Sequence, residues 1–439
     1  MKQVWGAFAL VAMAAAVPAE AFDAGGFTLS PVPPAQVGAA DLSSQQAMDL
    51  LGWQMFVAYN WPAAADQRGV ADPTKPFGTP GPVVWETWKS PNEVFYPDGS
   101  QPPPWEVYGT LIPPECTAAG AKAGSGPMVL SDILVNRTSQ AQGGSLTDQN
   151  GNLVHYSIAF NKPVFDFIYN NGYYSIAGQG SLSGPVEYGS GTAEMKAAWR
   201  VLMPEEANAV KSRFLRRTAY VYTPTTDAGP ASCKLQEVGL IGLHFDLKIT
   251  YPDGKPYWLM ATFEQVDNVP PFQTPFQPGK DAAHTLPYSL FSKSCYTKKC
   301  QYNWSTEFGR PITQPTQVIR VNDLDDPSKV LNPAMQQLFA QAVAGSPWQY
   351  YEMITTQYPT KPDQPPMAGP TPATSANTTM ETYLRGSSCI DCHYTAKDVN
   401  GKWFADYSFM LAQACPKPLF PSAHSSPSPA CQPAPKAAN

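Results

Sequence analysis

The sequence predicts an α+β protein: a β-rich antiparallel sheet or sandwich with peripheral helices, and a short C-terminal helical segment packed against it. Residues 129–270 contain successive strand-length runs rich in β-branched and aromatic residues. No helix-length segment alternates regularly with these runs, which disfavours a doubly wound parallel sheet. Pro and Gly are abundant, at 47 and 32 of 439 residues, as expected for long ordered loops between short elements.

The first 21 residues resemble a secretory signal peptide. One lysine precedes an apolar run from Val4 to Val17, and the small-x-small triplet Ala19-Glu20-Ala21 follows a proline. The run is too short to cross a bilayer, which needs about 20 residues, and no later segment is long and apolar enough. We expect cleavage after Ala21, a periplasmic or secreted protein, and no membrane span in the mature chain.

The elements are predicted in chain order as follows. A helix with one buried face begins after Asp41 or Ser43 and ends at Asn60-Trp61-Pro62. Pro- and Gly-rich loops follow to residue 128. Strands are expected at 128–135, 152–176, 195–202, 219–225, 237–250 and 257–266, the last two joined by a hairpin turn at Asp253-Gly254. Residues 332–359 are predicted as a helix, broken near residues 345–347.

These elements divide the chain into four parts. The signal peptide, residues 1–21, precedes a β-rich N-terminal domain at 22–345. Residues 346–415 form a helical segment that carries the motif described below, and residues 416–439 form a Pro/Ser-rich tail. The formal net charge of −6, without basic clusters, argues against nucleic acid and anionic membrane surfaces as partners.

Eight cysteines in an exported chain are expected to form disulfides unless another group claims them. The spacing of "CYTKKC" suggests a Cys295–Cys300 bridge. Cys415 and Cys431 flank the tail, and Cys116 would then pair with Cys233 by elimination. The sequence leaves this connectivity open.

The stretch "SSCIDCH" at residues 387–393 carries the most specific chemistry. In a CxxCH motif, two thioether bonds hold a c-type haem, and the adjacent histidine binds the iron. Cys389 and Cys392 are the predicted attachment points and His393 the proximal ligand of one covalent haem c. A thioredoxin-like motif would need a βαβ setting, a zinc site would need a second ligand pair, and a local disulfide is the remaining alternative.

The sequence does not identify the sixth ligand of the haem iron. Met410, 17 residues after His393, and His244, in a predicted strand, are the named candidates, and each also suits an ordinary core position. Two strong axial ligands would favour electron transfer. A vacant position would favour a haem enzyme of peroxidase or oxygenase type, or a haem-based gas or ligand sensor. Glu264 and Asp267 could serve as acid and base, or stabilise a turn.

Four stretches together resemble a family of exported bacterial mono-haem, cytochrome-c-like proteins of about this length. They are "KAAWRVL", "LIGLHFDLKIT", "ATFEQVDNVPP" and "TTMETYLRGSSCIDCH". The resemblance implies covalent haem at Cys389, Cys392 and His393 and a periplasmic location, without an assigned substrate. We therefore expect a periplasmic mono-haem c-type cytochrome that transfers electrons, with a soluble redox partner protein or a small-molecule substrate as its partner.

Overall fold

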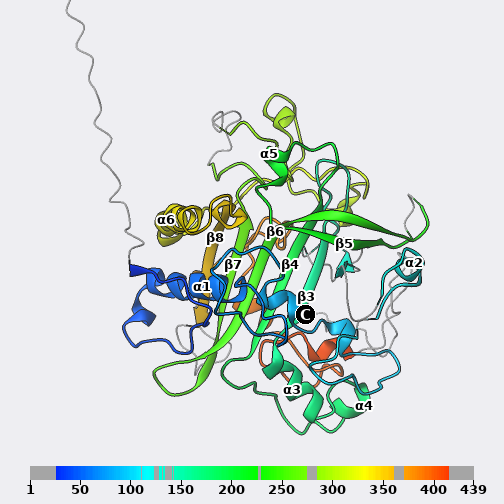
Figure 1. Ribbon diagram of the computed structural model, residues 1–439, viewed down its shortest axis with the longest axis vertical. Coiled ribbons are helices and arrows are strands. Elements are labelled where there is room, and N and C mark those ends of the chain that lie inside the picture. Colours follow the sequence, from blue (N-terminus) through cyan, green and yellow to red (C-terminus); the bar gives the residue numbers. More distant parts are fainter. Residues whose placement is uncertain are drawn as a thin grey trace, which may run out of the picture.

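One curled sheet organises the part of the chain that the structure describes (Figure 1). The structure is a computed structural model, and it describes residues 26–109, 111–122, 128–130, 132–133, 141, 143–225, 229–273, 284–359 and 370–414. The strands are β1 (Met128–Leu130), β2 (Asp132–Ile133), β3 (His155–Phe160), β4 (Ala193–Val201), β5 (Arg216–Thr223), β6 (Ser232–Thr250), β7 (Pro256–Gln265), β8 (Tyr351–Pro359) and β9 (Pro370–Thr371).

The helices lie between and around these strands. The α-helices are α1 (Gln45–Tyr59), α2 (Pro114–Ala118), α3 (Lys162–Asn170), α4 (Ile176–Gln179), α5 (Asn208–Lys211), α6 (Asp326–Ala342) and α7 (Cys389–His393). Short 3-10 turns are η2 (Asp41–Ser43), η3 (Val84–Thr87), η4 (Pro91–Glu93), η5 (Lys293–Tyr296), η6 (Thr306–Phe308), η7 (Pro347–Tyr350) and η8 (Leu411–Ala414). The α+β prediction is confirmed.

The sheet is antiparallel along its main path, in the order β2-β3-β4-β6-β7-β8-β9. β5 pairs with the first half of the long strand β6, and β1 runs parallel to β5, so the sheet is mixed at that corner. The predicted hairpin is confirmed: β6 and β7 pair from Thr250 and Pro256 inward, and Gly254 adopts φ 81° in the turn.

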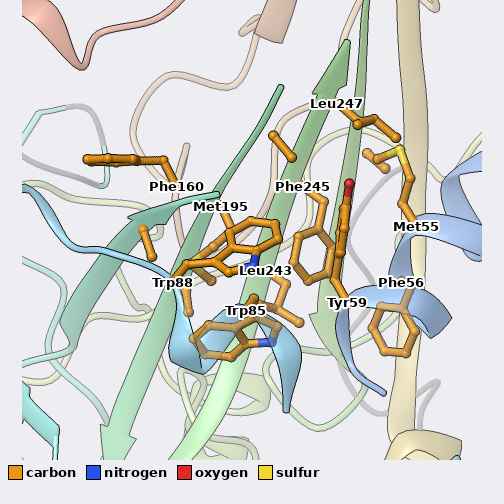
Figure 2. Close-up of a cluster of buried hydrophobic side chains, with 14 of the residues drawn as sticks. Met55, Phe56, Tyr59, Trp85, Trp88, Phe160, Met195, Leu243, Phe245 and Leu247 are labelled. Carbon is orange, nitrogen blue, oxygen red and sulfur yellow. The ribbon is translucent and has the colours of Figure 1, made fainter. Parts of the chain in front are cut away.

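The two faces of the sheet differ in chemistry, because side chains alternate along each strand. Leu243, Phe245 and Leu247 of β6 point to one side, which we call the apolar face. Helix α1 covers this face, and Figure 2 shows its residues Phe56 and Tyr59 beside those of β6. The ring centroids of Tyr59 and Phe245 are 5.3 Å apart. A large part of the hydrophobic core therefore lies between α1 and the central strands.

The opposite side, which we call the polar face, carries the alternate residues of the same strands. Here Lys196 of β4 stands opposite His244 of β6, and Glu194 stands opposite Asp246. Residues 370–414, which we call the C-terminal segment, pack on this face. Asn377 Nδ2, for example, donates to Phe263 O at 2.8 Å, and other contacts described below reach β4, β6 and β8.

Two sequence predictions of secondary structure are wrong. Residues 162–170, expected within a strand, form helix α3, because Pro163 lies in its first turn and Val164, Phe165 and Ile168 recur with helical spacing on its buried side. Residues 351–359, expected to continue a helix, form strand β8, which pairs with β7. Residues 346–415 are thus not mainly helical: among those described, they hold two strands, the five-residue helix α7 and two 3-10 turns.

The described residues contain two disulfides. Cys116–Cys233 links residues 117 positions apart, and we call it the long-range disulfide. Cys295–Cys300, the short disulfide, closes a loop of separation five. Both pairings match the expectation from the sequence. The predicted signal peptide, the tail, Cys415 and Cys431 lie outside the described residues. None of the described helices combines the length and apolar character of a bilayer-spanning segment.

Candidate functional site

The CxxCH motif forms helix α7, a little more than one helical turn. Ser388 is its N-cap: the hydroxyl accepts a hydrogen bond from Asp391 N at 3.2 Å. Residues three and four apart lie on one side of a helix, so Cys389 projects to the same side as Cys392 and His393. One short turn of helix therefore presents both thiols and the imidazole together.

Strand β8 holds this turn through a single glutamine. Gln357 Oε1 accepts a hydrogen bond from Ile390 N at 2.8 Å and another from Ser388 Oγ at 3.1 Å. Ile390 is fully buried. The backbone N–H of Cys389 donates to Ser375 Oγ at 3.0 Å, and its sulfur is also 3.0 Å from that oxygen. The orientation of α7 is thus fixed from β8 and from the preceding loop.

His393 has a defined tautomer. Its Nδ1 lies 2.7 Å from Tyr407 O, and because a carbonyl oxygen only accepts, Nδ1 carries the proton. The lone pair of the neutral ring is therefore on Nε2. This is the arrangement by which a backbone carbonyl orients a metal-ligating histidine. The ring also makes an edge-on contact with Phe409, at 5.1 Å between centroids.

The carbonyl that holds His393 belongs to an unusual turn. Asp406 and Tyr407 both have positive φ, 50° and 65°, which is costly for residues with a Cβ. Three contacts stabilise the turn: Lys248 Nζ pairs with the Asp406 carboxylate, Tyr188 N donates to the same carboxylate at 2.7 Å, and Trp258 Nε1 donates to Asp406 O at 2.8 Å. The polar face thereby positions the acceptor for His393.

The two motif thiols are not joined to each other, although the other two described cysteine pairs are disulfides. Burial, followed by the nearby Glu381 carboxylate, raises the pKa of both Cys389 and Cys392. A redox-active CxxC pair instead needs a thiol whose pKa is lowered. The environment therefore disfavours the thioredoxin-like interpretation and leaves both sulfurs as protonated thiols.

Charged residues of the polar face surround the motif. His244 Nε2 lies 3.5 Å from the carboxylate of Glu381, and both side chains are nearly buried. Burial acts to raise the pKa of Glu381, but His244 and then Lys196 outweigh it and hold the pKa below its ordinary value. Burial raises the pKa of Asp246, against the opposing effect of His393 and His244. His244 thus belongs to this cluster, which faces α7.

The other predicted ligand, Met410, lies in a different setting. It is 4% exposed and belongs to the hydrophobic core together with Ile390 and Leu411. Its backbone N–H donates to Ser408 Oγ at 3.1 Å. Of the two candidates for a sixth ligand, His244 is the one on the charged polar face.

Glu264, near the end of β7, and Asp267, just after this strand, both form structural ion pairs. The Glu264 carboxylate pairs with Arg320 and accepts a hydrogen bond from Thr378 N at 3.0 Å. Asp267 pairs with Arg213 at 2.5 Å. Both carboxylates therefore join loops to the sheet. This agrees with the structural alternative given in the sequence analysis, and not with a role as acid and base.

Sequence reasoning missed four residues of the cluster: Lys196, Asp246, Lys248 and Glu381. A signal was present for two of them in "LHFDLK", residues 243–248, where apolar and polar residues alternate strictly. That alternation places His244, Asp246 and Lys248 on one face of β6. The other two come from a neighbouring strand and a distant loop, and no local pattern connects them.

No group of three or more His, Cys, Asp or Glu side chains within the described ranges could hold a metal ion. An axial ligand to a haem iron requires only one histidine, so the absence of such a group does not bear on His393 as a haem ligand. Comparison of the chain with protein-family models, curated proteins and solved structures finds no match.

Proposed function

We propose that this chain is an exported mono-haem c-type cytochrome that transfers electrons, a member of the cytochrome-c-like family that its sequence resembles. Cys389 and Cys392 would hold the haem covalently, and His393 would bind its iron through Nε2. The observation that carries the proposal is the His393 Nδ1 contact with Tyr407 O, which leaves Nε2 as the coordinating nitrogen.

Two further observations support it. The motif thiols are unpaired in a chain whose other described cysteines form disulfides, so they are available for thioether bonds. The same disulfides fit an oxidising compartment, in agreement with a periplasmic or secreted location. When bound, haem would supply a one-electron redox centre, and the residues of the chain would orient the ring, limit access of water and set the local charge.

Covalent attachment is tested on protein exported with its own N-terminal sequence. After denaturation and removal of loosely held cofactor, we expect the wild-type chain to retain one haem by mass spectrometry and by the pyridine haemochrome spectrum. The Cys389→Ala/Cys392→Ala variant should retain none, whereas Cys300→Ser, which breaks only the short disulfide, should retain a full complement. A wild-type chain without covalent haem would refute the proposal.

A haem enzyme of peroxidase or oxygenase type is the second candidate, and the polar face favours it. Polar and ionisable groups near an iron decide between electron transfer and the binding or activation of small molecules. His244, Glu381 and Asp246 are such groups, and they face α7. A low-spin spectrum insensitive to cyanide, and to carbon monoxide after reduction, would support the electron carrier. A high-spin spectrum that shifts with these ligands would support the enzyme or a gas sensor.

A further inference from the structure

A large cavity lies on the apolar side of the sheet, away from the CxxCH motif. Its volume is about 870 Å³, within the range typical of small-molecule sites. Residues 31–35, 64–71, 105, 106 and 108, the start of α3 and Leu247 of β6 contribute to its lining, which includes none of the motif residues. Because Leu247 points opposite to its neighbours Asp246 and Lys248, the cavity and the motif lie on opposite faces of β6.

Aromatic side chains form much of the wall. Trp88 and Trp105 are each 4% exposed, and Tyr59 and Tyr108 also line the cavity. Flat rings of this kind bind other aromatic rings through stacked or edge-on contacts. Figure 2 shows Trp88 and Tyr59 beside each other on the apolar face, with their centroids 4.9 Å apart. The wall is therefore suited to a planar aromatic ligand.

The one arginine of the lining is committed to the wall itself. Arg68 pairs with Glu93 at 2.9 Å and donates to backbone carbonyls of Trp88, at 3.0 Å, and Trp105, at 3.1 Å. Its guanidinium lies 4.0 Å from the ring centroid of Tyr108. Its charge is neutralised and its donors are used, so Arg68 stabilises the aromatic wall and does not offer an anion site.

Tyr59 brings a polar atom to this apolar space. The residue is 4% exposed, and its hydroxyl makes no hydrogen bond to any other described residue. Burial raises the pKa of Tyr59, so the phenol stays neutral and able to donate. A ligand oxygen in the cavity would give this hydroxyl a hydrogen-bond partner.

We propose that this cavity binds a neutral, planar aromatic small molecule whose oxygen forms a hydrogen bond with the Tyr59 hydroxyl. The rings of Trp88, Trp105 and Tyr108 would contact the ligand plane. The site does not depend on haem, because the lining contains no motif residue. The failure of one proposal therefore leaves the other intact.

The test uses the purified full chain and two probes, 2-naphthol and naphthalene, which share a ring system but differ in the oxygen. Binding is followed by quenching of tryptophan fluorescence and confirmed by calorimetry. We expect Tyr59→Phe to weaken 2-naphthol binding about 3- to 10-fold, the effect of one neutral hydrogen bond, and to leave naphthalene binding unchanged. Tyr257→Phe, in the hairpin outside the cavity, should change neither affinity.

A second variant places the ligand in the cavity independently of Tyr59. Ala64 lines the cavity and is partly exposed, so Ala64→Trp should fill space there and abolish binding of both probes. Retained binding in Ala64→Trp, no binding of 2-naphthol to the wild-type chain, or an equal effect of Tyr59→Phe on the two probes would each overturn the proposal. If Tyr59→Phe fails to fold, the result with Ala64→Trp decides.

Discussion

A buried glutamate on the polar face makes the stability of this protein depend on pH in an unusual direction. Glu194 of β4 is 5% exposed, and Ser408 of the C-terminal segment donates a hydrogen bond to its carboxyl group. Burial, then Asp246 and Asp406, raise the pKa of Glu194, while the Ser408 bond opposes them; the outcome is a rise from 4.5 to about 8. Glu194 is therefore protonated in the folded protein at neutral pH.

The sign of the effect follows from the protons bound in each state. Between pH 4.5 and about 8, the folded state keeps a proton on Glu194 that the unfolded state has released. As the pH rises through this range, the free energy of unfolding therefore falls by about 1.4 kcal/mol for each pH unit, or by about 5 kcal/mol in all. Stability from this group is complete below pH 4.5 and is lost as the pH rises to 8.

Glu194→Gln isolates this term, because glutamine has the same shape and does not ionise. In urea unfolding at pH 5 and at pH 9, we expect the variant to match the wild type within about 1 kcal/mol at pH 5 and to be several kcal/mol more stable at pH 9. The exposed residue Glu187, changed to Gln, is the matched control and should show no such divergence. A difference between Glu194→Gln and the wild type that does not change with pH would refute the reasoning.

Two further predictions concern chain entropy and segment packing. Cys233→Ser, which opens the long-range disulfide, should lower the free energy of unfolding by about 5 kcal/mol. Cys300→Ser should lower it by only about 2 kcal/mol, because the short disulfide closes a much shorter loop. Equal losses for the two variants in urea unfolding would contradict this prediction. Gly242→Ala would place a Cβ 2.1 Å from Thr379 Oγ1, so limited proteolysis should release the C-terminal segment faster than in the control Gly189→Ala, where nothing lies within 4 Å. An unchanged cleavage rate in Gly242→Ala would show that the segment tolerates displacement from β6.

The sequence predicted the strands whose pattern is local. β4, β6 and β7 lie where alternation and β-branched residues placed them, and Asp253-Gly254 forms the expected turn. Helix α3 was missed because its aromatic residues are typical of strands. β8 was missed because it follows α6 after one short turn, and its strand state depends on pairing with β7, some 90 residues earlier.

The local geometry of the motif follows from its spacing, but the contacts that support it do not. Spacing alone brings Cys389, Cys392 and His393 to one side of a short helix. The tautomer of His393 depends instead on the backbone carbonyl of Tyr407. Tyr407 has a positive φ, which no sequence pattern predicts. Gly, Asn and Asp are the residues expected in that conformation, so Asp406 is compatible with it, whereas Tyr407 gives no signal.

The support for that turn shows why the motif requires the whole fold. Helix α7 has only five residues, too few to be stable alone, and the rest of the C-terminal segment contains only the two-residue strand β9 and turns. The carbonyl that orients His393 is held by the ion pair between Asp406 and Lys248, so the acceptor in the segment is set by a strand nearly 160 residues earlier. Breaking a buried pair of this kind by removing one partner costs about 3–5 kcal/mol, more than a short segment gains from its own turns. The segment and the sheet therefore form one structural unit, and the geometry of the CxxCH motif is a property of that unit.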